Sequence, residues 1–235
     1  MDHQDEYFDN LVTMLELIWG EGYMTPGGSD NVEKMFNGIE TKGKRILDIG
    51  CGLGGQAFEM VNTFGADVVG IDLEAPLIKR ATEAATKMGL QDRCKFHAVK
   101  AGALDFPDQS FDIVATSGAI TQVSDKANIF GECYRVLKPG GYLTCYDWTK
   151  SEKPLSEDMF YWFKMEGLTF ALETLEEYKV HLKKIGYIDV TIKDASDWYC
   201  NQARREYELM KGRLYPRMVE LLGQKDADHF VENWR

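Results

Sequence analysis

Between residues 44 and 148 the chain alternates short apolar segments with amphipathic ones, and this alternation limits the possible folds more than any other feature. The apolar segments, which we predict to be strands, read KRILDIG, ADVVGID, CKFHAV, FDIVATS and GGYLTCYDW. The segments between them carry apolar residues at helical spacing. Strands joined through helices favour right-handed crossovers and a parallel sheet covered on both faces. We therefore predict a doubly wound α/β fold.

A glycine-rich turn follows the first of these strands, from Asp48 to Gly55. In such sheets ligands bind at the carboxyl ends of the strands, where the strand order reverses. Gly50, Gly52 and Gly55 match the G-x-G-x-x-G dinucleotide pattern, and Asp72 lies where a ribose-binding acid belongs. Taken alone, this pattern is typical of both dehydrogenases and methyltransferases.

The charge balance bears on the class of partner. The chain has 27 lysine and arginine residues against 38 aspartate and glutamate residues, a net charge of -11. Nucleic acids and anionic membranes require clustered basic residues, so a neutral or cationic small-molecule substrate fits better. The cysteines and histidines are scattered, which predicts reduced thiols and no metal site. The acidic N-terminus does not resemble a signal peptide, and no apolar run is long enough to span a membrane, so we expect a cytoplasmic protein.

The segments outside the alternating region are expected to be mainly helical. The predicted elements are a helix over 6–19, a loop over 20–30, helices over 155–166 and 174–185, a strand over 187–194 and a long helix from about 198 to 222. We expect one domain with three parts: an N-terminal lid helix and loop (1–43), a cofactor-binding core (44–150), and substrate-side helices with sheet-closing strands (151–235).

The order of four motifs separates the two enzyme classes. These motifs are ILDIGCGLGG, VVGIDLE, FPDQSFDIVATS and RVLKPGGYL. Together they resemble the class I S-adenosylmethionine-dependent methyltransferases over residues 44–148. The resemblance implies a Rossmann-like, mostly parallel sheet of seven strands with helical lid elements, and S-adenosyl-L-methionine as the cofactor.

The resemblance also assigns cofactor-binding residues. The turn with Gly50 and Gly52 would approach the cofactor, and Asp48 would hold its methionine part. Asp72 would hold both ribose hydroxyls, Leu73 would pack on the adenine, and the Ser117 backbone would meet the amino acid part.

One position departs from the family pattern. Many relatives have an aspartate that accepts a hydrogen bond from the adenine amino group, whereas this chain has Lys100. Because lysine is only a donor, adenine recognition would depend on backbone groups near Ala101 and on apolar packing.

The flanking segments narrow the family. EYFDNLVTMLELIWGEGYMTPGG and ASDWYCNQARREYELMKG resemble the phosphoethanolamine (phosphobase) N-methyltransferases. In that family a tyrosine and a histidine close the site; the tyrosine falls on Tyr7 and the histidine position on Gln122. Met24 and Thr25 would lie beside the methionine end of the cofactor. Glutamine is no base, but it can hydrogen-bond a tyrosine hydroxyl.

The family's phosphate-binding residues are poorly matched. Leu15, Lys164, Leu168 and Phe170 stand where the family uses tyrosines and an arginine, and Gly118 replaces an acid after the fourth strand. Lysine lacks the fork geometry that suits arginine to phosphate. We therefore expect an acceptor pocket that is more apolar and less selective for phosphate.

Methyl transfer from a sulfonium needs mainly alignment, which favours an acceptor without a proton to lose. If a base is used, Tyr7 and Asp147 are the candidates, and Tyr23 and Trp148 would help to cover the site. Each of these aromatic residues could instead serve only in packing. The aromatic run over 160–163 is more typical of a core, although an aromatic cage for a cationic head group is the alternative.

We therefore predict a small-molecule methyltransferase, with N-methylation of a small amine or phosphobase-like acceptor favoured. Two alternatives stay open at this point. One is S-, O- or C-methylation of a more apolar metabolite, and the other is a non-catalytic S-adenosylmethionine-binding sensor or interaction protein.

Overall fold

The computed structural model describes residues 9–166 and 169–234, and its centre is one parallel sheet. The strand order is β3-β2-β1-β4-β5, and all four neighbouring pairs are parallel. The strands are β1 (Arg45–Ile49), β2 (Asp67–Asp72), β3 (Cys94–Ala98), β4 (Phe111–Ser117) and β5 (Leu137–Tyr146). The order reverses between β1 and β4, which places the expected ligand crevice beyond the ends of these two strands.

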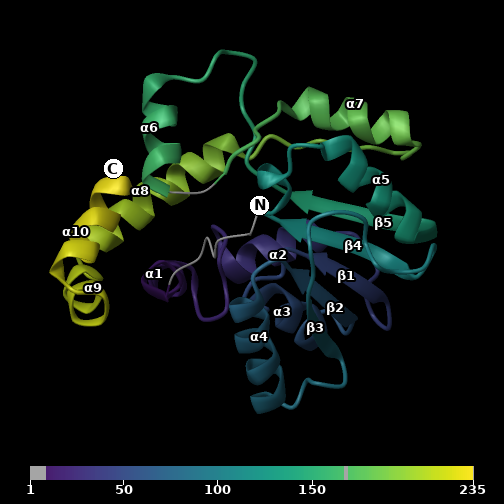
Figure 1. The fold of residues 1–235 in the computed structure, drawn as a ribbon, viewed down its shortest axis with the longest axis horizontal. Helices are drawn as coiled ribbons and strands as arrows, with labels where there is room; N and C mark the ends of the chain where they lie inside the picture. The colour runs from purple at the N-terminus through teal and green to yellow at the C-terminus, as the bar shows by residue number, and fades with distance from the viewer. Residues whose placement is uncertain (1–8, 167–168, 235) are drawn as a thin grey trace.

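Helices lie on both faces of the sheet and at one end of it (Figure 1). They are α1 (Asp9–Trp19), α2 (Gly28–Phe36), α3 (Gly55–Asn62), α4 (Ala75–Lys87), α5 (Lys126–Val136), α6 (Glu157–Glu166), α7 (Leu175–Ile185), α8 (Ser196–Lys211), α9 (Tyr215–Leu222) and α10 (Gln224–Asn233), with a short 3₁₀ turn at Ile120–Gln122. The chain therefore has the predicted doubly wound architecture.

The apolar residues of each strand divide between the two faces because successive side chains point in opposite directions. Ile46 and Ile113 pack with α2, α3 and α4 in one buried cluster. Their neighbours Leu47 and Val114 pack with α5 and α7 in the other. Both faces of the sheet are thus covered, as a sheet of continuous apolar strands requires.

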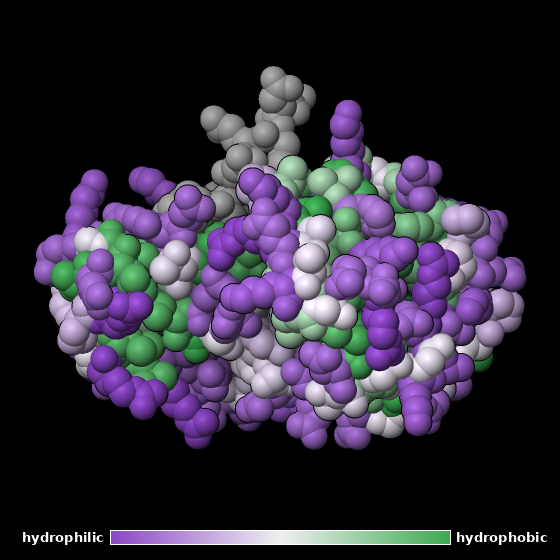
Figure 2. Space-filling model, turned by 90° about the horizontal axis from the view of Figure 1, so that it is seen from below, coloured by the Kyte–Doolittle hydropathy of each residue, from purple (hydrophilic) through white to green (hydrophobic). Residues whose placement is uncertain are grey.

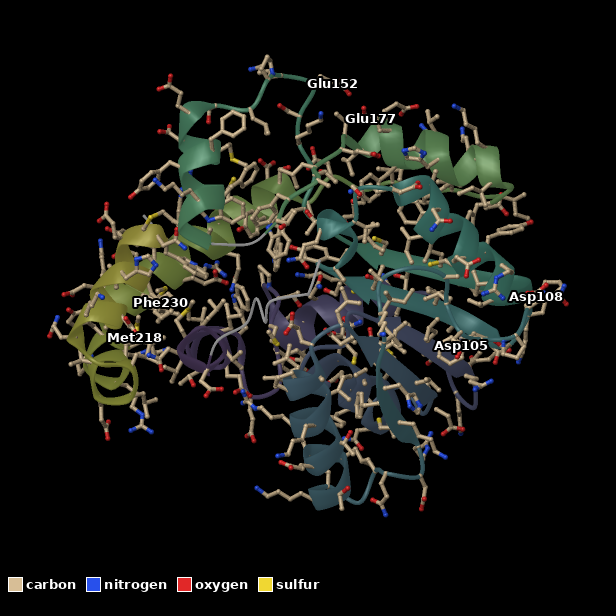
Figure 3. The ribbon with its side chains drawn as sticks, viewed as in Figure 1. Asp105, Asp108, Glu152, Glu177, Met218 and Phe230 are labelled. Carbon is tan, nitrogen blue, oxygen red and sulfur yellow. The ribbon has the colours of Figure 1, made fainter. Side chains whose placement is uncertain are left out.

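A third apolar cluster lies apart from the sheet and joins the two ends of the chain. It contains Leu11 and Met14 from α1, Met210 from α8, Met218 from α9 and Phe230 from α10. Met218 and Phe230 come from neighbouring helices and lie close together (Figure 3). Figure 2 shows apolar surface gathered at this end, whereas most of the remaining surface in that view is polar.

Two sequence-based expectations about this part of the chain are wrong. The described residues contain five strands, not seven, and 187–194 is not a strand. This segment pairs with no strand of the described residues. Ile188 is 84% exposed, and Asp189 has a φ of 52°, which departs from extended geometry. The single long helix expected up to residue 222 is interrupted after Lys211, where Gly212 and Pro216 divide it into α8 and α9. No helix in the described ranges is long and apolar enough to cross a membrane.

Candidate functional site

A cavity of about 680 Å³ lies at the carboxyl ends of the strands, between the sheet and the helices of the third cluster. Its floor includes Gly50 and Gly52 after β1, Asp72 after β2, and Gly118 after β4. Residues of α1, α6, α8 and α10 complete the opposite wall. The volume is within the range of small-molecule sites.

The turn after β1 requires glycine at the positions that the sequence pattern singled out. Gly50 has a φ of 72°, and a Cβ atom there would lie 2.3 Å from the Cβ of Ala119. Gly52 has a φ of 52° and faces Met24 at 3.0 Å from the sulfur. Because no larger residue fits this geometry, the backbone itself forms the surface that a ligand would meet.

Asp72 is held in place by two backbone amides at the edge of the cavity. Its Oδ2 accepts a hydrogen bond from the Gly52 amide at 2.8 Å, and its Oδ1 accepts one from the Glu74 amide at 3.0 Å. Burial raises the pKa of this carboxyl, and the two amides oppose that rise. A carboxyl fixed in this way can still accept hydrogen bonds from ligand hydroxyls, since each oxygen has a second lone pair.

Asp48 lies at the start of the turn, is 1% exposed and is not among the described residues that line the cavity, so its role in cofactor binding stays a prediction. Gln56 donates a hydrogen bond to its Oδ1 at 3.0 Å, whereas its Oδ2 is buried and accepts none from the part of the chain that the structure describes. Burial raises the pKa of the Asp48 carboxyl to about 7. An acid that is poorly solvated and half satisfied is suited to a cationic or hydrogen-bond-donating ligand group.

The loop before α2 reaches the cavity from the other side. Met24 and Thr25 line it, and their expected place beside the methionine end of the cofactor stays a prediction. The Ser117 hydroxyl, itself at the cavity wall, donates to the Thr25 hydroxyl at 3.3 Å and accepts from Asn31 at 3.3 Å. Tyr23 is not among the described lining residues, because its hydroxyl turns away and donates to Glu59 at 3.1 Å.

The turn after β4 is closed over by an aromatic ring. Gly118 has a φ of 75°, and a Cβ atom there would lie 2.9 Å from both Thr25 Cγ2 and Trp148 Cζ3. Gly118 and Trp148 both line the cavity, and so does Gln122. The Trp148 ring thus takes the space that any side chain at position 118 would need.

Asp147, one of the two candidate bases, is engaged elsewhere. Its Oδ2 accepts a hydrogen bond from the Tyr178 hydroxyl at 2.6 Å, its Oδ1 accepts one from the Trp148 amide at 3.1 Å, and it is not among the described lining residues. Burial raises its pKa to about 6. The geometry favours a structural role at the end of β5 over proton transfer from an acceptor.

Only some of the remaining predicted pocket residues line the cavity. Phe170 and Leu15 line the cavity, whereas Lys164 is exposed on α6 and is not among the described lining residues. Tyr7 and Leu168 lie outside the described residues, so their roles stay predictions. Of the cofactor-binding candidates, Leu73 and Ala101 also line the cavity, together with Lys100.

Three aromatic lining residues were not anticipated from the sequence: Trp19, Tyr199 and Trp234. Trp162 also lines the cavity, and it belongs to the aromatic run over 160–163 whose role the sequence left open. The one signal that pointed to the other three was the placement of aromatic residues in amphipathic segments, which is equally typical of a hydrophobic core.

With this fold and site in view, comparison with known proteins identifies the class. Residues 40–212 match the methyltransferase domain family, and the chain belongs to this family. The phosphoethanolamine N-methyltransferase of Plasmodium falciparum is 31% identical over 233 residues, which cover 98% of this chain and 86% of that protein. The resemblance to the phosphobase enzymes is therefore confirmed.

Plant and nematode relatives agree with this assignment. Phosphoethanolamine N-methyltransferase 3 of Arabidopsis thaliana is 28% identical, with 98% of this chain and 46% of that protein covered. A structure of Haemonchus contortus phosphoethanolamine N-methyltransferase 2 in complex with S-adenosyl-L-methionine matches with a TM-score of 0.91 and 27% identity, and covers 98% of this chain and 53% of that chain. The chain spans about half the length of the plant proteins it matches.

Proposed function

We propose that this chain is an S-adenosylmethionine-dependent methyltransferase that methylates a small molecule, with the nitrogen of an amine or phosphobase-like compound as the acceptor. The observation that carries the proposal is the glycine turn at the floor of the cavity, with Asp72 lining the cavity and the buried Asp48 at the start of the turn. A family match and a cavity alone would leave the ligand open, whereas these two acids fit a ligand with both a cation and hydroxyls.

The residues present fit the cofactor. Asp72 would accept from the ribose hydroxyls. Oδ2 of Asp48, which has no hydrogen-bond partner among the described residues, would be the acceptor for the methionine ammonium group. Leu73, which is 41% exposed and lines the cavity, offers an apolar surface for the adenine. Lys100 and Ala101 lie at the same wall, so the adenine amino group would meet backbone oxygens there rather than a carboxylate.

The chemistry that the cofactor supplies when bound is an electrophilic methyl group on a sulfonium sulfur. The contribution of the chain is to hold the acceptor in line with that group and to exclude water. Holding two reactants in a near-attack pose is worth roughly 7–11 kcal/mol of the barrier. With Asp147 bonded to Tyr178, an acceptor that arrives as a neutral amine suits the described site better than one that must lose a proton.

Calorimetry with S-adenosylhomocysteine tests the cofactor assignment. Asp72→Ala is expected to weaken binding at least about tenfold, which corresponds to about 1.4 kcal/mol for the lost hydrogen bonds to a partly buried carboxyl. The matched control is Asp92→Ala, because Asp92 is an exposed acid that does not line the cavity. Equal affinity in wild type and Asp72→Ala, or binding of a nicotinamide dinucleotide in place of S-adenosylhomocysteine, would overturn the assignment.

A second measurement separates an enzyme from a cofactor-binding sensor. Protein incubated with S-adenosylmethionine carrying a labelled methyl group and with pooled small-molecule extract should transfer the label to a small molecule. Protein that binds S-adenosylhomocysteine tightly but transfers no label to any extract would favour the sensor.

A further inference from the structure

Three aromatic pairs line the part of the cavity that faces the helices. Trp19 lies beside Trp234 with ring centroids 6.0 Å apart, and Trp162 lies beside Phe170 at 4.9 Å. Trp148 meets Tyr199 edge to face at 6.3 Å. All six line the same cavity, and we call them the aromatic compartment. Rings gathered around one space present either an apolar surface or, through their faces, a surface that attracts cations.

A buried acid lies directly behind this compartment. Glu206 is 1% exposed on α8, on the same face of the helix as Tyr199 and Ala203, which line the cavity. Its Oε1 accepts from the Trp19 indole at 2.7 Å, and its Oε2 accepts from the Trp234 indole at 3.1 Å. Glu206 therefore fixes the orientation of two rings that come from opposite ends of the chain.

The charge of Glu206 is compensated only by neutral donors in the described parts of the chain. Besides the two indoles, the Gln202 amide donates to Oε1 at 3.0 Å. No lysine, arginine or histidine within 9–166 and 169–234 forms an ion pair with Glu206. An indole whose N–H donates to a carboxylate has a more electron-rich ring, which strengthens its attraction for a cation.

The charged residues that line the cavity also favour a cationic ligand. Among the described lining residues they are Asp72, Glu74, Asp125 and Lys100. Lys100 follows β3, at the edge of the sheet opposite β5 and its neighbour Trp148. The compartment thus has no described cation at its surface. A phosphate group, which needs clustered basic donors, would meet aromatic rings rather than basic side chains in the described part of this lining.

We infer that the aromatic compartment is a cage for an alkylammonium group, so that the acceptor is an unphosphorylated amine whose methylated product is a cation. This inference rests on the proposed methyltransferase function and names the class of its acceptor. The cage stabilises the positive charge that the nitrogen gains on methylation, with Glu206 setting the two tryptophan walls. The same walls disfavour a phosphorylated amine of equal size.

Three small probes test the cage on the unmodified protein saturated with S-adenosylhomocysteine. They are choline, its uncharged isostere 3,3-dimethylbutan-1-ol, and phosphocholine. Choline is expected to bind about tenfold more tightly than either of the others, because desolvated cation–aromatic contacts are lost in the isostere and the phosphate is disfavoured in phosphocholine. Calorimetry gives the three affinities without any turnover.

The possible outcomes separate the cage from the proposed function. Tighter binding of phosphocholine would show that the site selects a phosphobase, and equal or tighter binding of the isostere would show an apolar site; either overturns the cage. Failure of all three probes to bind, while S-adenosylhomocysteine binds, also overturns it. Failure of S-adenosylhomocysteine to bind would instead overturn the proposed function.

Variants test the part assigned to Glu206. Glu206→Gln should weaken choline binding about threefold or more and leave S-adenosylhomocysteine binding unchanged, because the charge behind the rings is lost. The control is Glu208→Gln, since Glu208 is 65% exposed on the same helix and pairs with Lys211. If Glu206→Gln fails to fold by circular dichroism, Trp162→Leu removes one ring without touching Glu206 and should weaken choline by a similar factor. A folded variant with unchanged choline affinity contradicts the role given to that residue.

Discussion

Replacing Asp48 by asparagine is expected to stabilise the folded protein at neutral and alkaline pH. The side chain is fully buried, its Oδ2 has no partner in the described residues, and burial raises its pKa from an ordinary value of 3.8 to about 7. The stability associated with this neutral acid is complete below the unfolded pKa. It is lost as the pH rises through the folded pKa, because unfolding then releases a proton that the folded state holds.

The magnitude follows from the separation of the two pKa values. Each pKa unit corresponds to about 1.4 kcal/mol, so Asp48 lowers the free energy of unfolding by about 4 kcal/mol at pH 8 relative to strongly acidic pH. Between pH 5 and pH 8 the loss is about 2–3 kcal/mol, most of it below pH 7. Asparagine keeps the acceptor for Gln56 and does not ionise, so the variant should not show this part of the loss.

Urea denaturation of wild type and Asp48→Asn at pH 5, 6, 7 and 8 measures the effect directly. The advantage of the variant should grow by about 2–3 kcal/mol across this range and flatten above pH 7. Asp92→Asn is the control, since Asp92 is exposed and should give a constant difference. The same Asp48→Asn protein is expected to bind S-adenosylhomocysteine less tightly. An advantage that does not change with pH would refute the argument that burial sets the ionisation of Asp48.

Two further changes, one at the cavity wall and one at a buried lysine, are tested by the same denaturation measurement. Gly118→Ala should lower the free energy of unfolding by about 1–3 kcal/mol more than Gly38→Ala. Both glycines have a positive φ, but only the methyl group at position 118 would clash, at 2.9 Å from Trp148. Equal losses would show that the Trp148 ring moves freely. Lys126→Met should lower the free energy of unfolding by about 2–4 kcal/mol, because the buried Nζ donates to the Val123 and Ala171 carbonyls at 2.8 and 2.5 Å. A loss below about 0.5 kcal/mol would contradict the importance of these two hydrogen bonds.

The core of the fold was predictable because its signals are local. The five apolar segments between residues 44 and 148 are too short for helices and too apolar for loops, so a covered parallel sheet is the arrangement that buries them. The glycine turn was equally readable, since Gly50 and Gly52 occupy backbone geometry that other residues avoid. Asp72 was singled out by its spacing from the glycine turn, whereas Asp48 was assigned through the family resemblance.

The helical wall of the cavity was not predictable, because its contacts join residues that are far apart in the sequence. Glu206 and Trp19 are 187 positions apart, and nothing in either local segment indicates that they pair. The segment over 187–194 shows that an alternating apolar pattern alone does not make a strand. Its apolar alternation matches a strand, but it pairs with no strand in the described parts of the chain, and Ile188 is 84% exposed. The secondary structure of such a segment depends on the neighbours that it meets in the folded protein.

The separate apolar cluster of α1, α8, α9 and α10 has a consequence for how the protein opens. Because this cluster shares few buried residues with those that flank the sheet, the two ends of the chain should come apart together while the sheet stays folded. Their amides should therefore exchange with deuterated solvent at one common rate, slowed as a unit whenever a molecule occupies the space that Trp19 and Trp234 help to enclose.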